Sequence, residues 1–185
     1  RDNDVVLGSH GRGFWILDDI IPFRSAAEVN QTDEVILYPP SDPIRGIYPA
    51  KIQYYLKEQA DTVHIDLMDY NGVVIHSYSG FNSKYVPDPN VSRWMRGGST
   101  VPTTAKGLNT FTWDLRYPGA TSFDGMIIWS ARPQRGPLAP LGNYQVKIRV
   151  GDVQKTETFE IKIDPNLEEI TPADLQLQFD LSIQI

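Results

Sequence analysis

Two segments of the sequence combine flat aromatic side chains with arginines, a composition that is common on sugar-binding surfaces. An aromatic ring can stack on a sugar face while a guanidinium donates hydrogen bonds to hydroxyl or carboxylate oxygens. The candidate ligand-binding residues are Trp94 and Arg96 in the first segment and Trp129 and Arg132 in the second, with Tyr85, Arg93, Tyr117 and Arg135 nearby. The sequence therefore allows a carbohydrate-binding site, but we favour packing of the two segments on each other or on another domain.

A histidine, an arginine and two aspartates near the start of the chain have the side chains that acid–base chemistry requires. His10 and Arg12 fall in a glycine-rich turn, and Asp18 and Asp19 follow it. Adjacent residues of a strand point to opposite faces, so the two carboxylates do not form a ready acid–base pair. A tight turn with solvated or capping side chains explains these residues better, and we predict no catalytic residue.

The other candidate ligands lack the spacing of a metal or cofactor site. His64 and His76 are expected on outward strand positions, without a histidine or carboxylate at ligand spacing. Asp66, Asp69 and Asn71 lie close together, but the closing glutamate of a calcium loop is missing, so a hairpin turn is expected. The chain has no cysteine. We therefore predict neither a metal nor a cofactor.

The charge pattern narrows the classes of partner. The formal net charge is -6, and the 17 basic residues are scattered along the chain. A nucleic-acid surface needs clustered lysine and arginine, so we expect no nucleic-acid partner. No apolar run approaches the roughly 20 residues of a membrane helix, so we expect no membrane insertion.

The elements that would position these residues are mostly strands, because apolar and polar residues alternate with a period of two. Tyr144, Val146, Ile148 and Val150, for example, alternate with polar neighbours. Such strands have one buried and one solvated face. The predicted strands are residues 35–38, 51–57, 63–67, 73–78, 110–115, 144–150 and 158–163.

These strands and the turn signals between them predict an all-β, immunoglobulin- or fibronectin III-like sandwich over residues 34–164. Residues 79–107 and 117–142 are long insertions in this sandwich. Trp113 alternates with polar neighbours and is expected in the core. Tyr144 is placed to form a tyrosine corner, in which its hydroxyl bonds back to the backbone.

Residues 1–33 are predicted to form a β-hairpin followed by a short helix or linker. The strands Val5–Ser9 and Phe14–Asp18 flank a turn with two glycines, and Pro22–Val29 is the helix or linker. An isolated two-stranded hairpin is marginally stable in water. We therefore expect this hairpin to pair with the sandwich or with a second copy of the chain.

Residues 165–185 are predicted to begin a helical segment that is truncated at the end of the chain. Thr171 is the expected N-cap, Pro172 occupies the first helical position, and Asp174 lies near the cap. The apolar side chains must be buried somewhere, so a homodimer through this helix or through the hairpin is a further expectation. The residues expected to dock are Leu175, Phe179 and Leu181.

Four stretches carry a family resemblance: GSHGRGFWILDDI, WDLRYPGATSFDGMIIW, GPLAPLGNYQVKIRV and TPADLQLQFDLSIQI. They resemble the C-terminal region of bacterial secreted proteins with BNR or sortilin (Vps10)-like repeats, often described as glycosyl-hydrolase-like. In that family a large β-propeller precedes an immunoglobulin-like domain. The resemblance implies that the hairpin derives from the last propeller blade, and that the preceding propeller domain is a partner.

The resemblance also implies a secreted, periplasmic or cell-surface location. An active site on the propeller face of such a protein would have no matching positions in this chain. The expected function is that of a non-catalytic accessory or interaction module. The alternative is a carbohydrate-binding module with glycan as partner, and a share in a hydrolase active site is the least favoured interpretation.

Overall fold

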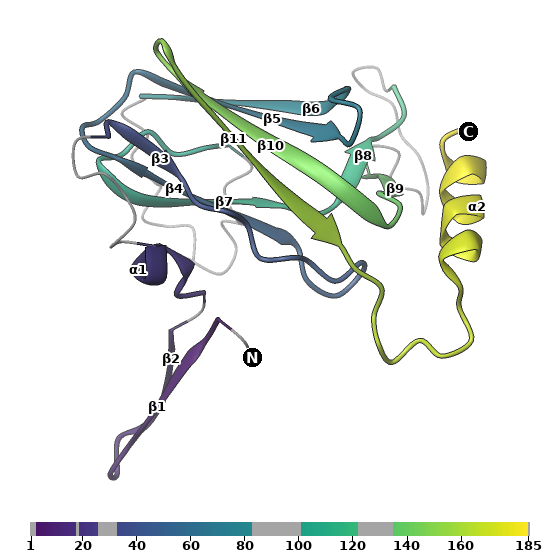
Figure 1. The fold of residues 1–185 in the computed structure, drawn as a ribbon, viewed down its shortest axis with the longest axis horizontal. Coiled ribbons are helices and arrows are strands. Elements are labelled where there is room, and N and C mark those ends of the chain that lie inside the picture. The colour runs from purple at the N-terminus through teal and green to yellow at the C-terminus, as the bar shows by residue number, and fades with distance from the viewer. Residues whose placement is uncertain (1–2, 18, 26–32, 83–100, 122–134, 185) are drawn as a thin grey trace, which may run out of the picture.

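The computed structural model describes residues 3–17, 19–25, 33–82, 101–121 and 135–184. It shows a mostly β protein with several antiparallel sheets and two helices (Figure 1). The elements are β1 (Val5–Ser9), β2 (Gly13–Leu17), α1 (Ile21–Ser25), β3 (Val35–Leu37), β4 (Ala50–Leu56), β5 (Thr62–Asp69), β6 (Val74–Phe81), β7 (Gly107–Trp113), β8 (Arg116–Pro118), β9 (Arg135–Leu138), β10 (Gly142–Val150), β11 (Val153–Ile161) and α2 (Pro172–Ser182).

Two larger sheets form the body of the molecule. One has the strand order β11-β10-β5-β6 and the other has the order β3-β4-β7, with every neighbouring pair antiparallel. All seven strands predicted from alternation are present, with shifted ends. The strand that differs most from its predicted bounds is β11, which begins at Val153 and not at residue 158. It begins earlier because its pairing with β10 continues to the turn, where Val150 faces Val153.

The two larger sheets contribute to one hydrophobic core. Trp113 of β7 lies 5.9 Å from the ring of Tyr144 and 6.3 Å from the ring of Phe159, measured between centroids. Tyr144 and Phe159 belong to the other sheet, on β10 and β11. Trp113 is 1% exposed, which confirms its predicted place in the core. Its indole N–H donates to the carbonyl of Arg116 at 3.0 Å, so its polar atom is also satisfied.

The structure also contains two short strands, β8 and β9, that alternation does not reveal. They pair with each other in an irregular register. Three or four residues that include proline and glycine are too few to show a period of two. Leu115, between β7 and β8, has a φ of 61° although it is not glycine, and it is fully buried. Packing in the core holds this unfavourable backbone conformation.

Residues 102–105 are fixed against both larger sheets. A Cβ atom on Gly80 of β6 would lie 1.8 Å from the carbonyl oxygen of Pro102. On the other sheet, the Tyr54 hydroxyl donates to the Thr103 carbonyl at 2.5 Å, and the side-chain amide of Asn109 donates to the Ala105 carbonyl at 2.8 Å. This segment therefore ties β6 to β4 and β7.

The helix predicted near the C-terminus is confirmed over Pro172–Ser182. Thr171 caps it, and Asp174 completes a capping box through reciprocal hydrogen bonds with Thr171. Leu175 is buried, and the ring of Phe179 lies 4.7 Å from that of Tyr117. Leu181 does not dock on the body: this side chain is 57% exposed because it lies on another face of the helix. Its docking across a dimer stays a prediction.

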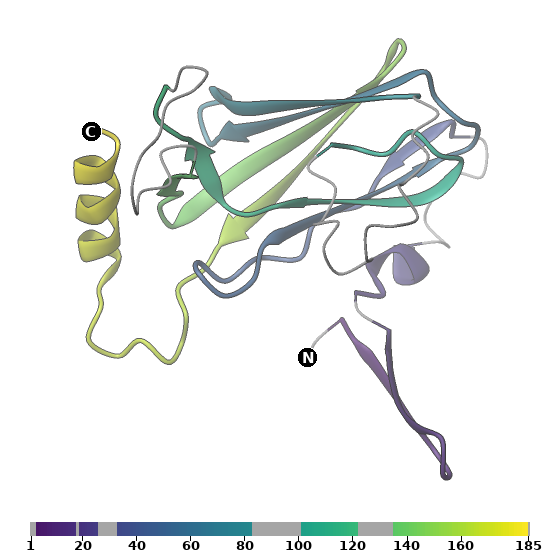
Figure 2. The same ribbon diagram turned by 180° about the vertical axis from the view of Figure 1, so that it is seen from behind.

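Neither helix in the described part of the chain is long and apolar enough to cross a membrane. Figure 2 shows, from behind, that α2 lies beside the β8–β9 end of the body, whereas the β1–β2 hairpin projects away from it.

Candidate interaction surface

The hairpin formed by β1 and β2 leaves six large apolar side chains exposed: Val6, Leu7, Phe14, Trp15, Ile16 and Leu17. Among the described residues, its two strands pair only with each other. Phe14 is 83% exposed, and Trp15 and Ile16 are each about two-thirds exposed. The expectation that the hairpin pairs with the larger sheets is therefore wrong for this chain, because the hairpin points away from the body (Figure 1). Pairing with a second copy stays a prediction.

Both faces of the hairpin are apolar. Leu7 faces Trp15 across the strands, and Val6 faces Ile16 in the neighbouring pair. Directly opposite residues share a face and successive residues alternate, so these two pairs lie on opposite faces. A hairpin with one face in water normally carries polar residues on that face. The β1–β2 pair instead has the composition of strands that are covered on both sides.

The glycines in the turn of the hairpin adopt the positive φ angles that the sequence predicts. Gly11 and Gly13 have φ values of 77° and 85°, which side chains with a Cβ rarely adopt. The Ser9 hydroxyl donates to the Gly13 carbonyl at 2.9 Å and closes the turn. The hairpin is thus a well-defined local structure even though its sides are uncovered.

A polar network holds the base of the hairpin to the body. The Asn3 carbonyl accepts from the Ile20 amide at 2.7 Å, and the Asp4 carboxylate accepts from the Asp19 amide at 3.0 Å. Ser41, which precedes β4, lies within hydrogen-bond distance of the side chains of both Asn3 and Asp19, at 3.3 Å. The sequence offers no local signal for Asn3 and Ser41, because they are 38 residues apart.

The acid–base candidates at the hairpin are not brought together. His10 and Arg12 lie in the turn at the tip, whereas Asp19 lies at the base, where it is buried and has a φ of 56°. Asp18 lies outside the described residues. A tip and a base separated by the length of two strands do not form one site.

The four predicted ligand-binding residues, Trp94, Arg96, Trp129 and Arg132, lie outside the described residues. Two of their neighbours in sequence are described. Tyr117 packs on Phe179 of α2 and so serves packing rather than an open binding surface. Arg135 is exposed at the start of β9.

The remaining ligand candidates have structural roles. His64 bonds to the Ser79 hydroxyl at 2.8 Å on the outer face of β5 and β6. His76 is opposite buried Leu67 and thus lies on the core side, which corrects its predicted outward position. Asp69 accepts from the amides of Asn71 and Val73 and closes the predicted turn. Within the described ranges, no three histidine or acidic side chains gather in a way that could hold a metal ion.

The shifted pKa values belong mostly to core packing. Burial raises the pKa of Tyr78 to about 12, and the nearby Asp114 carboxylate adds to the rise. Burial also raises the pKa of Tyr144, whose hydroxyl donates to the Pro140 carbonyl at 2.9 Å. That hydrogen bond, back to a residue four positions earlier, confirms the predicted bonding of Tyr144 to the backbone. Desolvation raises the pKa of Glu157 on β11.

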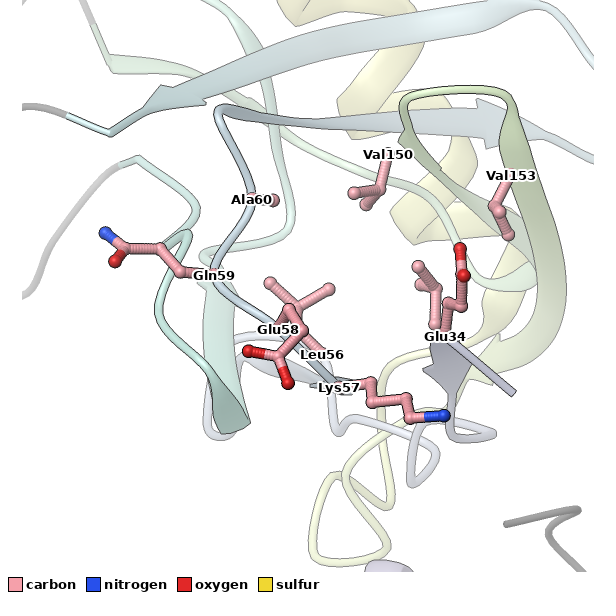
Figure 3. A pocket seen from close by; sticks show the side chains of 9 residues that line it. Glu34, Leu56, Lys57, Glu58, Gln59, Ala60, Val150 and Val153 are labelled. Carbon is pink, nitrogen blue, oxygen red and sulfur yellow. The ribbon is translucent and has the colours of Figure 1, made fainter. Parts of the chain in front are cut away.

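A depression of about 320 Å³ lies at the end of the body where β4 leads into β5 and β10 turns into β11 (Figure 3). Its apolar lining comes from Val35, Leu56, Ala60, Val150 and Val153, and its polar lining comes from Glu34, Lys57, Glu58 and Gln59. Glu58 is paired with Lys106 at 2.9 Å. Figure 3 shows the side chains of Lys57 and Gln59 pointing in different directions. The polar groups therefore do not converge on one point as in a catalytic site.

Comparison with known proteins adds no family to this geometry. No family model matches the chain, and no curated protein matches it. Among the described residues, the strongest candidate for function is the hairpin, because it combines two exposed apolar faces, strand edges without a described partner, and a polar attachment to the body.

Proposed function

We propose that this chain is a non-catalytic accessory module of a secreted propeller protein, and that the hairpin β1–β2 docks on the preceding propeller domain of the same protein. The observation that carries this proposal is the pair of apolar faces on a hairpin whose strands have no third strand among the described residues. The resemblance of GSHGRGFWILDDI to a last propeller hairpin supports the choice of partner, and implies a secreted, periplasmic or cell-surface location.

The body of the module is proposed to be an immunoglobulin- or fibronectin III-like β-sandwich. Three features support this assignment. A three-stranded and a four-stranded antiparallel sheet share one core. Consecutive strands cross between the sheets, as from β4 to β5 and from β6 to β7. The Tyr144 hydroxyl reaches back to the Pro140 carbonyl, which is the bonding of a tyrosine corner.

Burial of the hairpin would satisfy two physical demands at once. Neighbouring strands of a propeller blade would pair with the free edges of β1 and β2, whose unpaired backbone groups otherwise invite aggregation. Adjacent blades would cover the two faces that carry Trp15 and Phe14. Among the described residues, the side-chain contacts of the hairpin with the body are at its polar base, through Ser41, so both faces are available for this contact.

The test is hydrogen exchange, measured by mass spectrometry, on the natural full-length protein and on the 185-residue chain. In the full-length protein the amides of β1 and β2 should exchange at least about tenfold more slowly than in the short chain. The amides of β10, at the centre of the larger sheet, provide the internal control and should exchange equally slowly in both proteins.

Equal exchange of the hairpin amides in both proteins would contradict the proposal. A double variant of the full-length protein, Phe14→Ser with Ile16→Ser, sharpens the result because both side chains lie on one face. It should restore fast exchange in the hairpin while leaving β10 protected. The matched control is Val73→Ser, which changes an exposed apolar residue of the body.

A further inference from the structure

The two edges of the four-stranded sheet differ in how they are protected against pairing. β11 forms one edge and carries Lys155 and Glu157 opposite the fully buried Ile148 and Val146 of β10. Opposite residues share a face, so both charged side chains are on the core side of an edge strand. Inward-pointing charges of this kind oppose the addition of another strand.

Chain contacts also cover the end of β11. The carboxylate of Asp42 accepts from the Glu160 amide at 2.9 Å and pairs with the ammonium of Lys162. Ile44 forms a bridge to Lys162, and the Arg45 amide donates to the Lys162 carbonyl at 2.9 Å. This edge is therefore blocked by charge and by a neighbouring segment.

β6 forms the other edge, and within the described ranges it has neither charged residues nor a paired segment to protect it. Its sequence, VIHSYSGF, contains no aspartate, glutamate, lysine, arginine or proline over 8 residues. β8 approaches β6 but pairs with β9 instead. The register shift of β6 lies near Val74, before the regular stretch from His76 to Phe81. In the described part of the chain no backbone group pairs with the outer side of this regular stretch.

The hydrogen bond of the Asn82 backbone amide shows which backbone groups of β6 face outward. Its amide donates to the Asp61 carbonyl at 2.9 Å, on the side of β5. Alternate residues of a strand direct their backbone groups to the same side. The even-numbered residues of the regular stretch thus bond to β5, and the N–H and C=O groups of Ser77, Ser79 and Phe81 point to the free edge.

We propose that two copies of this chain join through β6, antiparallel and two-fold symmetric about Ser79. In this register Ser79 faces Ser79 of the second copy, and Ser77 faces Phe81, so all three outward-bonding residues find a partner. The absence of charge on β6 favours a second copy as the occupant, because a two-fold axis places any charge near its own duplicate.

The apolar residues at the end of the strand fit the same arrangement. Phe81 is 65% exposed and lies on the outer face, because it is opposite Thr62, which alternates with buried Val63. The two-fold axis brings Phe81 of each copy beside Ser77 of the other and so covers part of each ring. This surface is separate from the hairpin and does not depend on its role.

A cysteine placed on the proposed axis tests the register, because the natural chain contains no cysteine. Ser79→Cys should form a disulfide-linked dimer under mild oxidation, since paired residues of adjacent strands lie within the Cα separation of about 4.4–6.8 Å that a disulfide requires. Ser77→Cys is the matched control and should not crosslink to itself, because the axis places it opposite Phe81. Equal crosslinking of the two variants, or none for Ser79→Cys, would overturn the proposal.

Sedimentation equilibrium on the 185-residue chain provides the second measurement. The wild-type chain should dimerise reversibly, and Ser79→Pro should raise the dissociation constant at least about tenfold, because proline removes an outward N–H and leaves the bonds to β5 intact. Trp15→Ser, in the hairpin, should leave the dissociation constant unchanged. A wild-type chain that stays monomeric into the millimolar range, or a dimer that is lost with Trp15→Ser and kept with Ser79→Pro, would refute the arrangement.

Discussion

The core between the two larger sheets and the β1–β2 hairpin are built from the same kinds of residue, yet their burial is opposite. Trp113 in β7 is 1% exposed, whereas Trp15 in β2 is 65% exposed. Both residues lie in antiparallel strands with good backbone pairing. The difference lies in the number of layers that each pattern needs. An alternating strand needs one covering layer, which the opposite sheet supplies, whereas a strand that is apolar on both faces needs two.

The largest expected effect separates these two tryptophans. Trp113→Ala should lower the free energy of unfolding by about 3–5 kcal/mol, because it leaves a large cavity in the core. Trp15→Ala should change it by less than about 0.5 kcal/mol, because the ring is mostly in water in this chain. Urea unfolding followed by far-ultraviolet circular dichroism measures both values. Similar losses for the two variants would show that the hairpin is buried against the body.

A smaller effect is expected for the hydroxyl of Tyr144. Tyr144→Phe should cost about 1 kcal/mol of stability, because the Pro140 carbonyl loses its donor in a partly buried place. Tyr70→Phe is the control and should be neutral, since Tyr70 is 71% exposed. The same unfolding measurement applies. An unchanged stability for Tyr144→Phe would mean that water replaces the donor and that the hydrogen bond from Tyr144 to Pro140 does not stabilise the fold.

Two side chains on different faces of helix α2 should contribute differently to its attachment to the body. Phe179→Ala removes the ring that packs on Tyr117 and should weaken the attachment of α2 by about 1 kcal/mol. Leu181→Ala, only two residues further on, should have no effect on attachment because the side chain is exposed. Amide exchange within α2 reports the attachment. Faster exchange in both variants would indicate a contact with Leu181 that forms in solution.

The smallest expected effect is a pH dependence at the start of α2. Hydrogen bonds from Thr171 lower the pKa of Asp174 below its usual value of 3.8. A carboxyl group whose pKa is lowered on folding stabilises the fold above the unfolded value, and the stabilisation is lost as the pH falls through the lower folded value. Amide chemical shifts of the first turn of α2 should therefore move towards coil values below a pH of about 4. Asp174→Asn should abolish this transition; a transition that survives in the variant would assign it to another carboxylate.

The larger sheets and α2 were predictable from the sequence because their signals are local. Alternation in Tyr144–Val150 marks a strand by itself, and Thr171 followed by Pro172 marks a helix start. The irregular elements were not predictable in this way. β8 and β9 are too short to show a period, and the left-handed backbone of Leu115 follows from core packing that no short window of sequence contains.

The candidate site was predictable only in part. The hairpin and its glycine turn follow from the sequence between Val5 and Leu17, but its free position does not. The apolar composition of the hairpin predicts pairing with the body or with a second copy, whereas the contacts at its base through Asn3 and Ser41 are polar and long-range. The glycan prediction depends on residues outside the described ranges. Titration of the wild-type chain with a glycan panel at millimolar concentration tests that prediction directly.

The close approach of Gly80 and Pro102 restricts how this protein can diverge in sequence. Any side chain at position 80 would need the space that the Pro102 carbonyl oxygen occupies, 1.8 Å from a Cβ atom. A substitution there is accommodated only if residues 102–105 shift, and that shift breaks the bonds to Tyr54 and Asn109. We therefore expect homologous sequences to keep glycine at position 80. Where they replace it, we expect residues 102–105 to change as well.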